Sequence, residues 1–450
     1  MLLKKLSPVV FCAATAAYFL GCSTDTLSST EDSSGASSEL KETYKYLTEY
    51  YYLADQELSP LSSYVDSPYK VYISDKYADV ADVLGMFYTV SDKLTRYFPS
   101  ALFEQVNSAL NESDVDDKSF GMELDSSLSV KYVYKEGPAK SAGIQRRDTL
   151  SAVDGHSFAT LSEFNDYIAS VSSTDSFQFT FARNDSSYQV SMTRVPLNLP
   201  TVYVDTVGGI PLIRITQFTR VTNGYSDSGT AYEFDSALEE TQGAKATILD
   251  LRGNGGGYVN LCTYMAAALL SKNDTLIYEE DWNPSNKTNP AVTIYRTDRD
   301  GIGSGRYYVL MLDSNSASCT ELFAAAVTEN LKSPIVGTNS FGKAIGQIYA
   351  TTSSKGICGI TSSLYFDKNG NSYHTLGFSP DFYIPDSLEA IEKAVELAQS
   401  GTFQRTAGYS SEVQPYWTTP KNLYKRSASI FSEEELMESL KGLAITDFVP

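Results

Sequence analysis

Two apolar segments of the chain each run into a turn of small residues and then into an apolar, helix-forming segment. Residues 245–251 lack the polar–apolar alternation of a half-exposed strand, so they predict a strand buried on both faces. A glycine-rich turn at 252–257 and an apolar helix at 259–270 follow it. A strand at 307–312, a small polar turn and a helix at 321–331 repeat this order. The repetition of strand, turn and helix predicts an α/β layout.

The second of these helices opens on a capping box, in which Glu321 stands three residues after Ser318. By itself the capping box predicts only a stable helix start. Together, however, the two turns place backbone N–H groups at neighbouring helix N-termini, which is how an oxyanion hole is commonly built. A phosphate site at 253–257 is disfavoured, because neither the Walker Lys-Ser/Thr nor the dinucleotide glycine spacing is present.

Length and charge limit the classes of function. A chain of 450 residues is too long for one hydrophobic core and predicts two or three domains. A formal net charge of -20 argues against nucleic acid as a partner and against spontaneous adsorption to an anionic membrane. Beyond the first 22 residues, the cysteines are Cys262, Cys319 and Cys358. Three cysteines cannot all pair with one another, and their spacing fits no zinc site. We therefore expect no metal and no cofactor.

Residues 1–22 have the pattern of a targeting segment. Lys4 and Lys5 precede an apolar run at 9–20 that is too short to span a membrane comfortably, and Cys22 follows a small residue. The segment resembles a bacterial lipoprotein box, in which the Cys22 thiol would carry the lipid, although Phe19 stands where Leu is usual. An ordinary secretory signal is the alternative. The lipoprotein interpretation predicts a cell-envelope protein, anchored to the outer membrane and facing the periplasm or the cell surface.

Composition shifts divide the rest of the chain. The Ser-rich stretch 23–38 suits a flexible tether. The aromatic, amphipathic segment after it predicts a helical domain whose tyrosines are core residues, and the last segment gives no functional signal. The predicted divisions are a helical N-terminal domain at 39–112, a PDZ-like domain at 117–196, an α/β core at 197–401 and an extension at 402–450.

The β-rich segment resembles a PDZ domain. The run Gly-Pro-Ala-Lys-Ser-Ala-Gly-Ile at 137–144 and the Val-Asp-Gly at 153–155 match the usual pattern, whereas Arg147 replaces a usual Gly. PDZ domains bind an extended C-terminal peptide as an added strand, and backbone N–H groups hold its carboxylate. The resemblance implies that Phe120, Gly121 and Met122 bind the peptide. The alternative is a sheet insert that only packs.

Four motifs of the core resemble, in the same order, those of the C-terminal processing proteases, also called tail-specific proteases. Together the motifs are specific, although each alone would be weak. The resemblance covers about residues 119–400, and the lipid box and Tyr-rich segment are similar to those of members from Bacteroidetes-like bacteria. The motifs are Leu-Arg-Gly-Asn-Gly-Gly-Gly at 251–257, Ser-Ala-Ser-Cys-Thr-Glu at 316–321, Phe-Gly-Lys-Ala-Ile-Gly-Gln at 341–347 and Gly-Phe-Ser-Pro-Asp at 377–381.

The resemblance implies a ClpP/crotonase-like α/β protease core and a serine endopeptidase that takes hold of polypeptide tails. Ser318 would be the nucleophile, Lys343 the general base and Gln347 the residue that positions Lys343. A lysine can serve as a base only when neutral, so its pKa must be lowered by burial. The oxyanion would be stabilised by the backbone N–H of Cys319, aided by that of Gly257 or Gly256. The thiol of Cys319 would be small buried filler.

Three alternatives compete with this interpretation. A Ser-His site would need His156, which we expect at the surface, or His374, which we expect to be structural. A non-catalytic peptide-binding lipoprotein would have no use for a lysine in an apolar pocket. A small-molecule esterase would be expected to carry a Gly-x-Ser-x-Gly elbow, which is lacking here.

Overall fold

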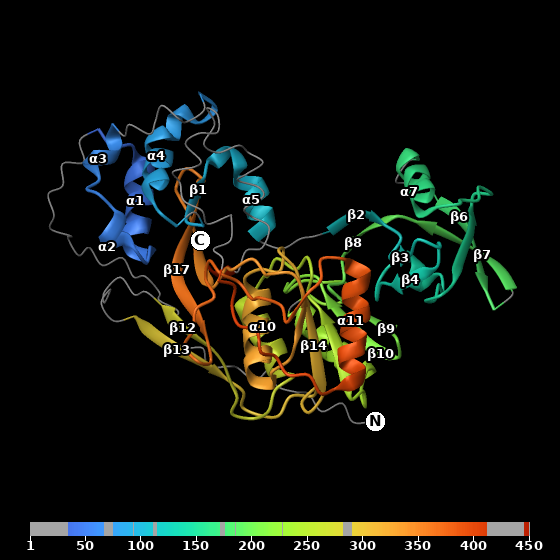
Figure 1. The fold of residues 1–450 in the computed structure, drawn as a ribbon. Helices are drawn as coiled ribbons and strands as arrows, with labels where there is room; N and C mark the ends of the chain where they lie inside the picture. Colours follow the sequence, from blue (N-terminus) through green and yellow to red (C-terminus); the bar gives the residue numbers. More distant parts are fainter. Residues whose placement is uncertain are drawn as a thin grey trace, which may run out of the picture.

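The computed structural model combines a helical N-terminal region, a β-rich domain and an α/β core (Figure 1). Because residues 1–34 are not described, the predicted targeting segment with Cys22 and residues 23–34 of the predicted tether lie outside the described part. Helix α1 (Ser38–Tyr50) is capped by Ser37. The structure describes residues 35–66, 75–92, 94–110, 115–171, 176–184, 186–226, 228–281, 290–411 and 445–449.

The main sheet of the core has the order β18-β15-β14-β11-β10-β9. Its strands run parallel except for the β9–β10 pair. All five residues of β11 are buried, which confirms the prediction of a strand covered on both faces. The strands are β9 (Val202–Val207), β10 (Ile210–Ile215), β11 (Ala246–Asp250), β14 (Tyr307–Leu312), β15 (Ile335–Gly337) and β18 (Phe382–Tyr383).

Successive side chains of each strand point to opposite faces of this sheet, so its buried strands have apolar side chains on both faces. Helices cover both of these faces. Leu249 and Leu310 pack with helices α8 (Gly229–Glu240), α9 (Val259–Ala267) and α10 (Cys319–Leu331). Ile248 and Met311 pack instead against α11 (Ser387–Ser400). Figure 1 shows α10 and α11 on opposite sides of β14. The multidomain α/β architecture predicted from the sequence is therefore confirmed.

A second sheet has the order β13-β12-β17-β16-β19, and β1 also pairs with β17. The N-terminal helices pack on this sheet, where Ile348, Cys358 and Ile360 join their hydrophobic core. The expected tyrosine core is present, since Tyr51 and Tyr64 are buried there. The strands are β1 (Arg96–Phe98), β12 (Thr275–Asp281), β13 (Ala291–Arg296), β16 (Ile345–Thr351), β17 (Ile357–Asp367) and β19 (Ile445–Val449). The remaining elements of the N-terminal region are α2 (Ala54–Glu57), α3 (Ser62–Val65), η2 (Asp75–Val80), α4 (Ala81–Thr89), η3 (Ser100–Leu102) and α5 (Phe103–Leu110).

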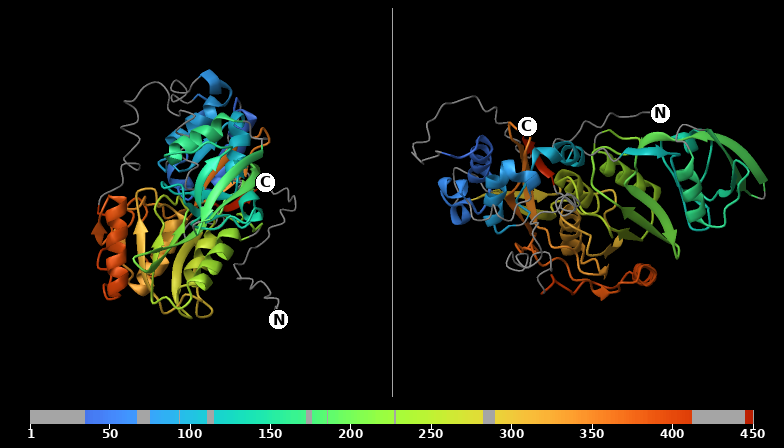
Figure 2. Two further views of the ribbon diagram at one scale, coloured as in Figure 1. Left: turned by 90° about the vertical axis from the view of Figure 1, so that its right-hand side faces the viewer. Right: turned by 90° about the horizontal axis from the view of Figure 1, so that it is seen from above.

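The β-rich domain has its own hydrophobic core, built on Phe177, Phe179 and Phe181. It stands at one end of the molecule, and the N-terminal helices lie at the other end (Figure 2). Its elements are β2 (Val115–Ser119), β3 (Met122–Leu124), β4 (Val130–Val133), α6 (Pro138–Ser141), β5 (Thr149–Val153), α7 (Leu161–Ser170), β6 (Ser176–Arg183), β7 (Ser186–Thr193) and β8 (Val195–Asn198).

Part of the segment beyond residue 401, whose sequence indicates no function, packs on the core. The Arg405 guanidinium is buried and pairs with the Asp381 carboxylate at 2.9 Å. Strand β19 runs parallel to β16 and extends the second sheet. Among the described residues, no helix is long and apolar enough to cross a membrane.

Candidate active site

Ser318 lies between the end of strand β14 and the first residue of helix α10. Its backbone has φ 60° and ψ -118°, a conformation that non-glycine residues rarely adopt. The residue is 1 % exposed, and its hydroxyl oxygen makes no hydrogen bond within the described part of the chain. Strained backbone of this kind costs about 1–3 kcal/mol and is concentrated at functional sites.

The buried carboxylate of Glu321 joins the two segments of the site. Its Oε2 atom accepts hydrogen bonds from the main-chain N–H of Ser318 at 3.0 Å and of Lys343 at 2.7 Å. Its Oε1 atom accepts from the Gly342 N–H and the Ser340 hydroxyl. Burial raises the pKa of the Glu321 carboxyl group, and these four hydrogen bonds oppose the shift. Because Ser318 and Lys343 share one acceptor atom, their backbones are neighbours.

Lys343 is 3 % exposed and extends its amine into the protein interior. The Nζ atom donates a hydrogen bond to Gln347 Oε1 at 2.9 Å. Burial lowers the pKa of Lys343 to about 7, because the charged ammonium loses its hydration. The negative charges of Asp92 and Glu321 oppose this shift, and the positive charge of Arg96 adds to it. A lysine with this pKa is about half neutral near pH 7.

Gln347, on strand β16, is held by the N-terminal region of the chain. Its Nε2 atom donates to the Leu94 carbonyl oxygen at 2.6 Å, which directs Oε1 toward the Lys343 amine. The Leu94 segment is itself tied down, because Asp92 accepts from the Leu94 N–H and the Thr361 hydroxyl. From its sequence, this region was expected to have no chemical role. No local motif marks Leu94, since a main-chain carbonyl leaves no trace in a sequence pattern.

The glycine-rich turn and the serine turn meet beside Ser318, since a Cβ on Gly256 would lie 3.0 Å from Cys319 N. The backbone N–H groups of Cys319 and Gly257 make no hydrogen bond to any described residue. That of Gly256 donates to Asn254 Oδ1 at 2.9 Å. In this conformation the Gly256 N–H is therefore already hydrogen-bonded, which favours Gly257 of the two glycines predicted to supply an oxyanion donor. Gly256 instead allows close approach, since a Cβ there would lie 2.9 Å from Ser318 Cβ.

Cys319 is not the buried filler that we expected from the sequence. Its sulfur forms a disulfide with Cys262 of helix α9, with the two Cα atoms 5.9 Å apart. Of the cysteines in the described part, Cys358 remains a buried free thiol. Spacing could not reveal the pair, because the two cysteines are 57 residues apart and meet only when α9 and α10 pack.

The two histidines differ in their distance from the site. His156 is exposed, as expected. His374, which we expected to be only structural, lies close enough to Lys343 for charge on the lysine to affect it. Burial lowers the pKa of His374, the positive charge of Lys343 lowers it further, and Asp92 opposes the shift. The structure gives no hydrogen bond between His374 and the Ser318 hydroxyl.

The predicted peptide-binding residues lie at the start of strand β3. The Phe120 ring is buried against Phe177 and Phe179. Gly121 has φ 76°, a left-handed conformation that glycine adopts readily, and its N–H donates to the Ser119 hydroxyl. Met122 opens β3, which pairs with β4 alone among the described strands. No described strand pairs with the other edge of β3.

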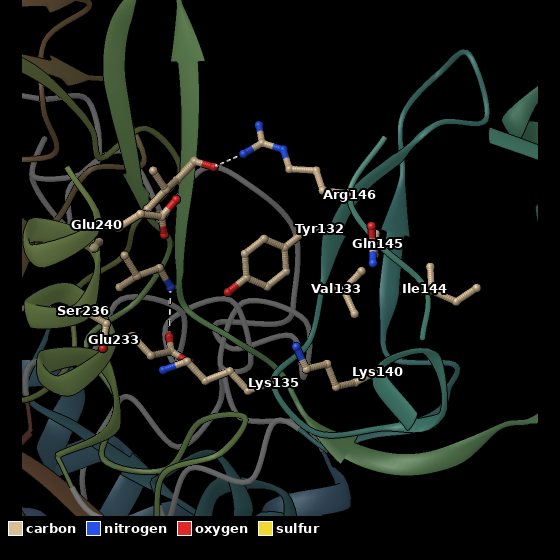
Figure 3. A pocket seen from close by; sticks show the side chains of 13 residues that line it. Tyr132, Val133, Lys135, Lys140, Ile144, Gln145, Arg146, Glu233, Ser236 and Glu240 are labelled. Atoms are coloured by element: carbon tan, nitrogen blue, oxygen red, sulfur yellow. Dashed lines mark hydrogen bonds between the residues drawn. The ribbon is translucent and has the colours of Figure 1, made fainter. Parts of the chain in front are cut away.

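A cavity of about 350 Å³ separates the β-rich domain from helix α8 (Figure 3). Lys140 and Arg146 line it from the β-rich domain, and Glu233 and Glu240 line it from α8. Ser318, by contrast, is not among the residues lining it. The cavity belongs to the junction between the two domains. The described residues contain no group of three or more His, Cys, Asp or Glu side chains that could hold a metal ion.

The fold and the site together define a class of protein. Its α/β core of two sheets and their helices holds a candidate Ser–Lys site, and a small β-rich domain is attached to this core. Residues 209–384 match the family model described as peptidase family S41, and residues 111–193 match that of the PDZ domain. Residues 209–384 therefore form a peptidase family S41 domain, and residues 111–193 form a PDZ domain.

Individual relatives are distant. The chain is 24% identical over 320 residues to a probable CtpA-like serine protease of Staphylococcus epidermidis, covering 70% of this chain and 62% of the relative. It is 23% identical to the carboxy-terminal processing protease CtpA of Bacillus subtilis, covering 82% and 79%. The chain thus spans about three fifths of the first of these relatives. A candidate S41 protease from Bacteroides fragilis shares the fold with a TM-score of 0.50, 14% identity and coverage of 80% and 97%.

Proposed function

We propose that the protein is a serine endopeptidase that cleaves polypeptides through an acyl-enzyme intermediate. One observation carries the proposal: the buried Lys343 amine, with a pKa of about 7, lies in the segment that Glu321 joins to the strained Ser318. A serine hydroxyl needs a neighbouring base to attack a carbonyl carbon, and a lysine can act as that base only when neutral. Gln347 orients the amine without adding the negative charge that would keep it protonated.

In the proposed reaction, Lys343 Nζ takes the proton from the Ser318 hydroxyl as its oxygen attacks the peptide carbonyl. The Cys319 and Gly257 N–H groups stabilise the negative charge on the carbonyl oxygen, and the loss of one such donor typically costs about 3 kcal/mol. The tetrahedral intermediate collapses to an ester on Ser318, and Lys343 returns the proton to the departing amine. Water then hydrolyses the ester by the same route.

The PDZ domain supports polypeptide tails as the substrate class. The edge of β3 that pairs with no described strand can accept an extended peptide as an added strand, and Phe120, Gly121 and Met122 lie where its C-terminal carboxylate would be held. The Gly121 N–H already donates to the Ser119 hydroxyl. We therefore assign the contacts with the peptide carboxylate first to the N–H groups of Phe120 and Met122. Binding at this edge would raise the local concentration of substrate beside the core.

A serine-reactive probe combined with product analysis tests the proposal. The wild-type protein is incubated with a generic unfolded protein, before and after treatment with a fluorophosphonate, and the products are identified by mass spectrometry. We expect endoproteolytic products, their loss after treatment, and the label on Ser318. Tail-peptide binding without turnover or labelling would identify a peptide-binding adaptor instead. Preferred turnover of small esters would identify an esterase.

We also propose that the mature chain is anchored through a lipid on Cys22, at the outer membrane and facing the periplasm or the cell surface. The support is the sequence pattern of residues 1–22. In cells fed with labelled palmitate, we expect label in the wild-type protein and none in Cys22→Ala. Equal label in the two proteins, or no label in either, would contradict a lipid on Cys22 and would favour an ordinary secretory signal at residues 1–22.

A further inference from the structure

A disulfide bond lies directly beside the proposed nucleophile. Cys319 follows Ser318 and is the first residue of helix α10. Its partner Cys262 is the fourth residue of helix α9, which begins shortly after Gly257. Both cysteines are fully buried. The bond therefore joins the two helices whose N-terminal segments present the Cys319 and Gly257 N–H groups.

Hydrogen bonds also join the glycine-rich turn at 252–257 to the serine turn, but they involve the first part of the glycine-rich turn. The Asn254 carbonyl oxygen accepts from the Ala317 N–H at 3.0 Å and from the Thr320 hydroxyl at 2.9 Å. Gly257 lies beyond this contact, where residue 258 donates its N–H to the Phe218 carbonyl oxygen at 3.0 Å. Hydrogen bonds thus fix the first half of the glycine-rich turn to the serine turn. The disulfide is the covalent link on the Gly257 side.

We propose that the Cys262–Cys319 disulfide is a positioning element of the oxyanion hole, holding the Cys319 and Gly257 N–H groups at a fixed separation. The inference rests on the proposed function. Donors stabilise a developing oxyanion only when they are preorganised, and catalytic groups must be held to within about 0.5 Å. Without the link, side-chain packing alone holds the start of α9 against the start of α10, so the two N-terminal segments are less firmly held relative to each other. This impairs the transition state more than substrate binding, which takes place in part at the distant PDZ domain.

Three single variants test the inference. Cys262→Ala and Cys319→Ala both break the bond, and Cys319→Ala keeps its main-chain N–H. Cys358→Ala is the matched control, because it removes a buried thiol that is not in the disulfide. In both disulfide variants we expect kcat to fall about 10- to 100-fold with KM within about two-fold, because donors are loosened rather than lost. Affinity for a peptide aldehyde, which forms a tetrahedral adduct, should fall in parallel, and tail-peptide binding should stay unchanged.

Equal kcat in the disulfide variants and Cys358→Ala would overturn the inference, as would a change confined to KM. A wild-type protein without turnover would instead overturn the proposed function. If a disulfide variant fails to fold, as judged by circular dichroism, the wild-type protein is treated with dithiothreitol. The reagent supplies two electrons and two protons to the sulfur atoms and becomes a cyclic disulfide.

In that second experiment, alkylation and peptide mapping report the state of Cys262 and Cys319. We expect kcat to fall in proportion to the fraction found as thiols and to return on reoxidation with oxidised glutathione. Full kcat with both cysteines found as thiols overturns the inference. A fall that accompanies loss of near-ultraviolet circular dichroism also overturns it, because the bond would then be maintaining the fold rather than positioning the donors.

Discussion

Replacing Ser318 with alanine is expected to reduce cleavage of an unfolded polypeptide by at least about 10³-fold, to the level of the oxyanion donors alone. The variant keeps the backbone and the Glu321 hydrogen bonds but loses the attacking oxygen. Initial rates on a fluorescent peptide and on unfolded protein measure the effect. Tail-peptide binding should not change, since the PDZ domain has its own core. Turnover by Ser318→Ala equal to that of the wild type would contradict the assignment.

Ser318→Gly is the matched partner of this variant. It is equally unable to attack, yet glycine adopts φ 60° and ψ -118° without a Cβ penalty. We expect its free energy of unfolding to exceed that of Ser318→Ala by about 1 kcal/mol, measured by chemical denaturation. A Gly variant less stable than the Ala variant would show that Ser318 carries no backbone strain.

The pH dependence of cleavage should follow the Lys343 amine. Because burial lowers the pKa of Lys343 to about 7, we expect kcat/KM to be level above that pH and to fall about ten-fold per pH unit below it. Below the pKa the amine is protonated and cannot accept the Ser318 proton. Lys343→Met should lose turnover at every pH, because the methionine side chain has no base. A profile that is flat from pH 5 to 9 would exclude a lysine base.

The same pKa shift has a consequence for stability that does not depend on activity. Between about pH 7 and the usual lysine pKa of about 10.4, the unfolded chain binds a proton at Lys343 that the folded chain does not. The free energy of unfolding of the wild type, relative to Lys343→Met, should therefore rise by about 1.4 kcal/mol per pH unit in this window. Denaturation at pH 7.5, 8.5 and 9.5 measures the difference. Parallel curves would mean that Lys343 is not desolvated.

Local patterns predicted much of the fold and the position of the site. The unbroken apolar run of strand β11 marked a strand covered on both faces, and the two small-residue turns marked the neighbouring N-termini of α9 and α10. These features are readable because hydrophobic periodicity and turn chemistry act over a few residues. Ser318, Lys343 and Gln347 could be named through the family resemblance, which supplied their roles.

The unpredicted features all depend on contacts between segments far apart in the chain. The Leu94 carbonyl reaches Gln347 across 253 positions, and the disulfide joins Cys262 to Cys319 across 57. Similarly, a choice between Gly256 and Gly257 as donor required the position of the Asn254 amide oxygen. Spacing within a motif does not record which main-chain groups are already hydrogen-bonded.

The hydrogen bond from Gln347 to Leu94 means that the smallest competent catalytic unit is larger than the segment that defines the family. A fragment limited to residues 209–384 would contain Ser318, Lys343 and Gln347 but lack the carbonyl that orients the glutamine. The two ends of a glutamine amide have nearly the same shape, so an amide without this restraint could rotate and turn its NH2 group toward the lysine. That NH2 group would face the protonated lysine as a second donor, and with the neutral lysine it would donate to the lone pair that must accept the serine proton. The N-terminal region thus fixes the orientation of the Gln347 side chain, which lies some 250 positions later in the sequence.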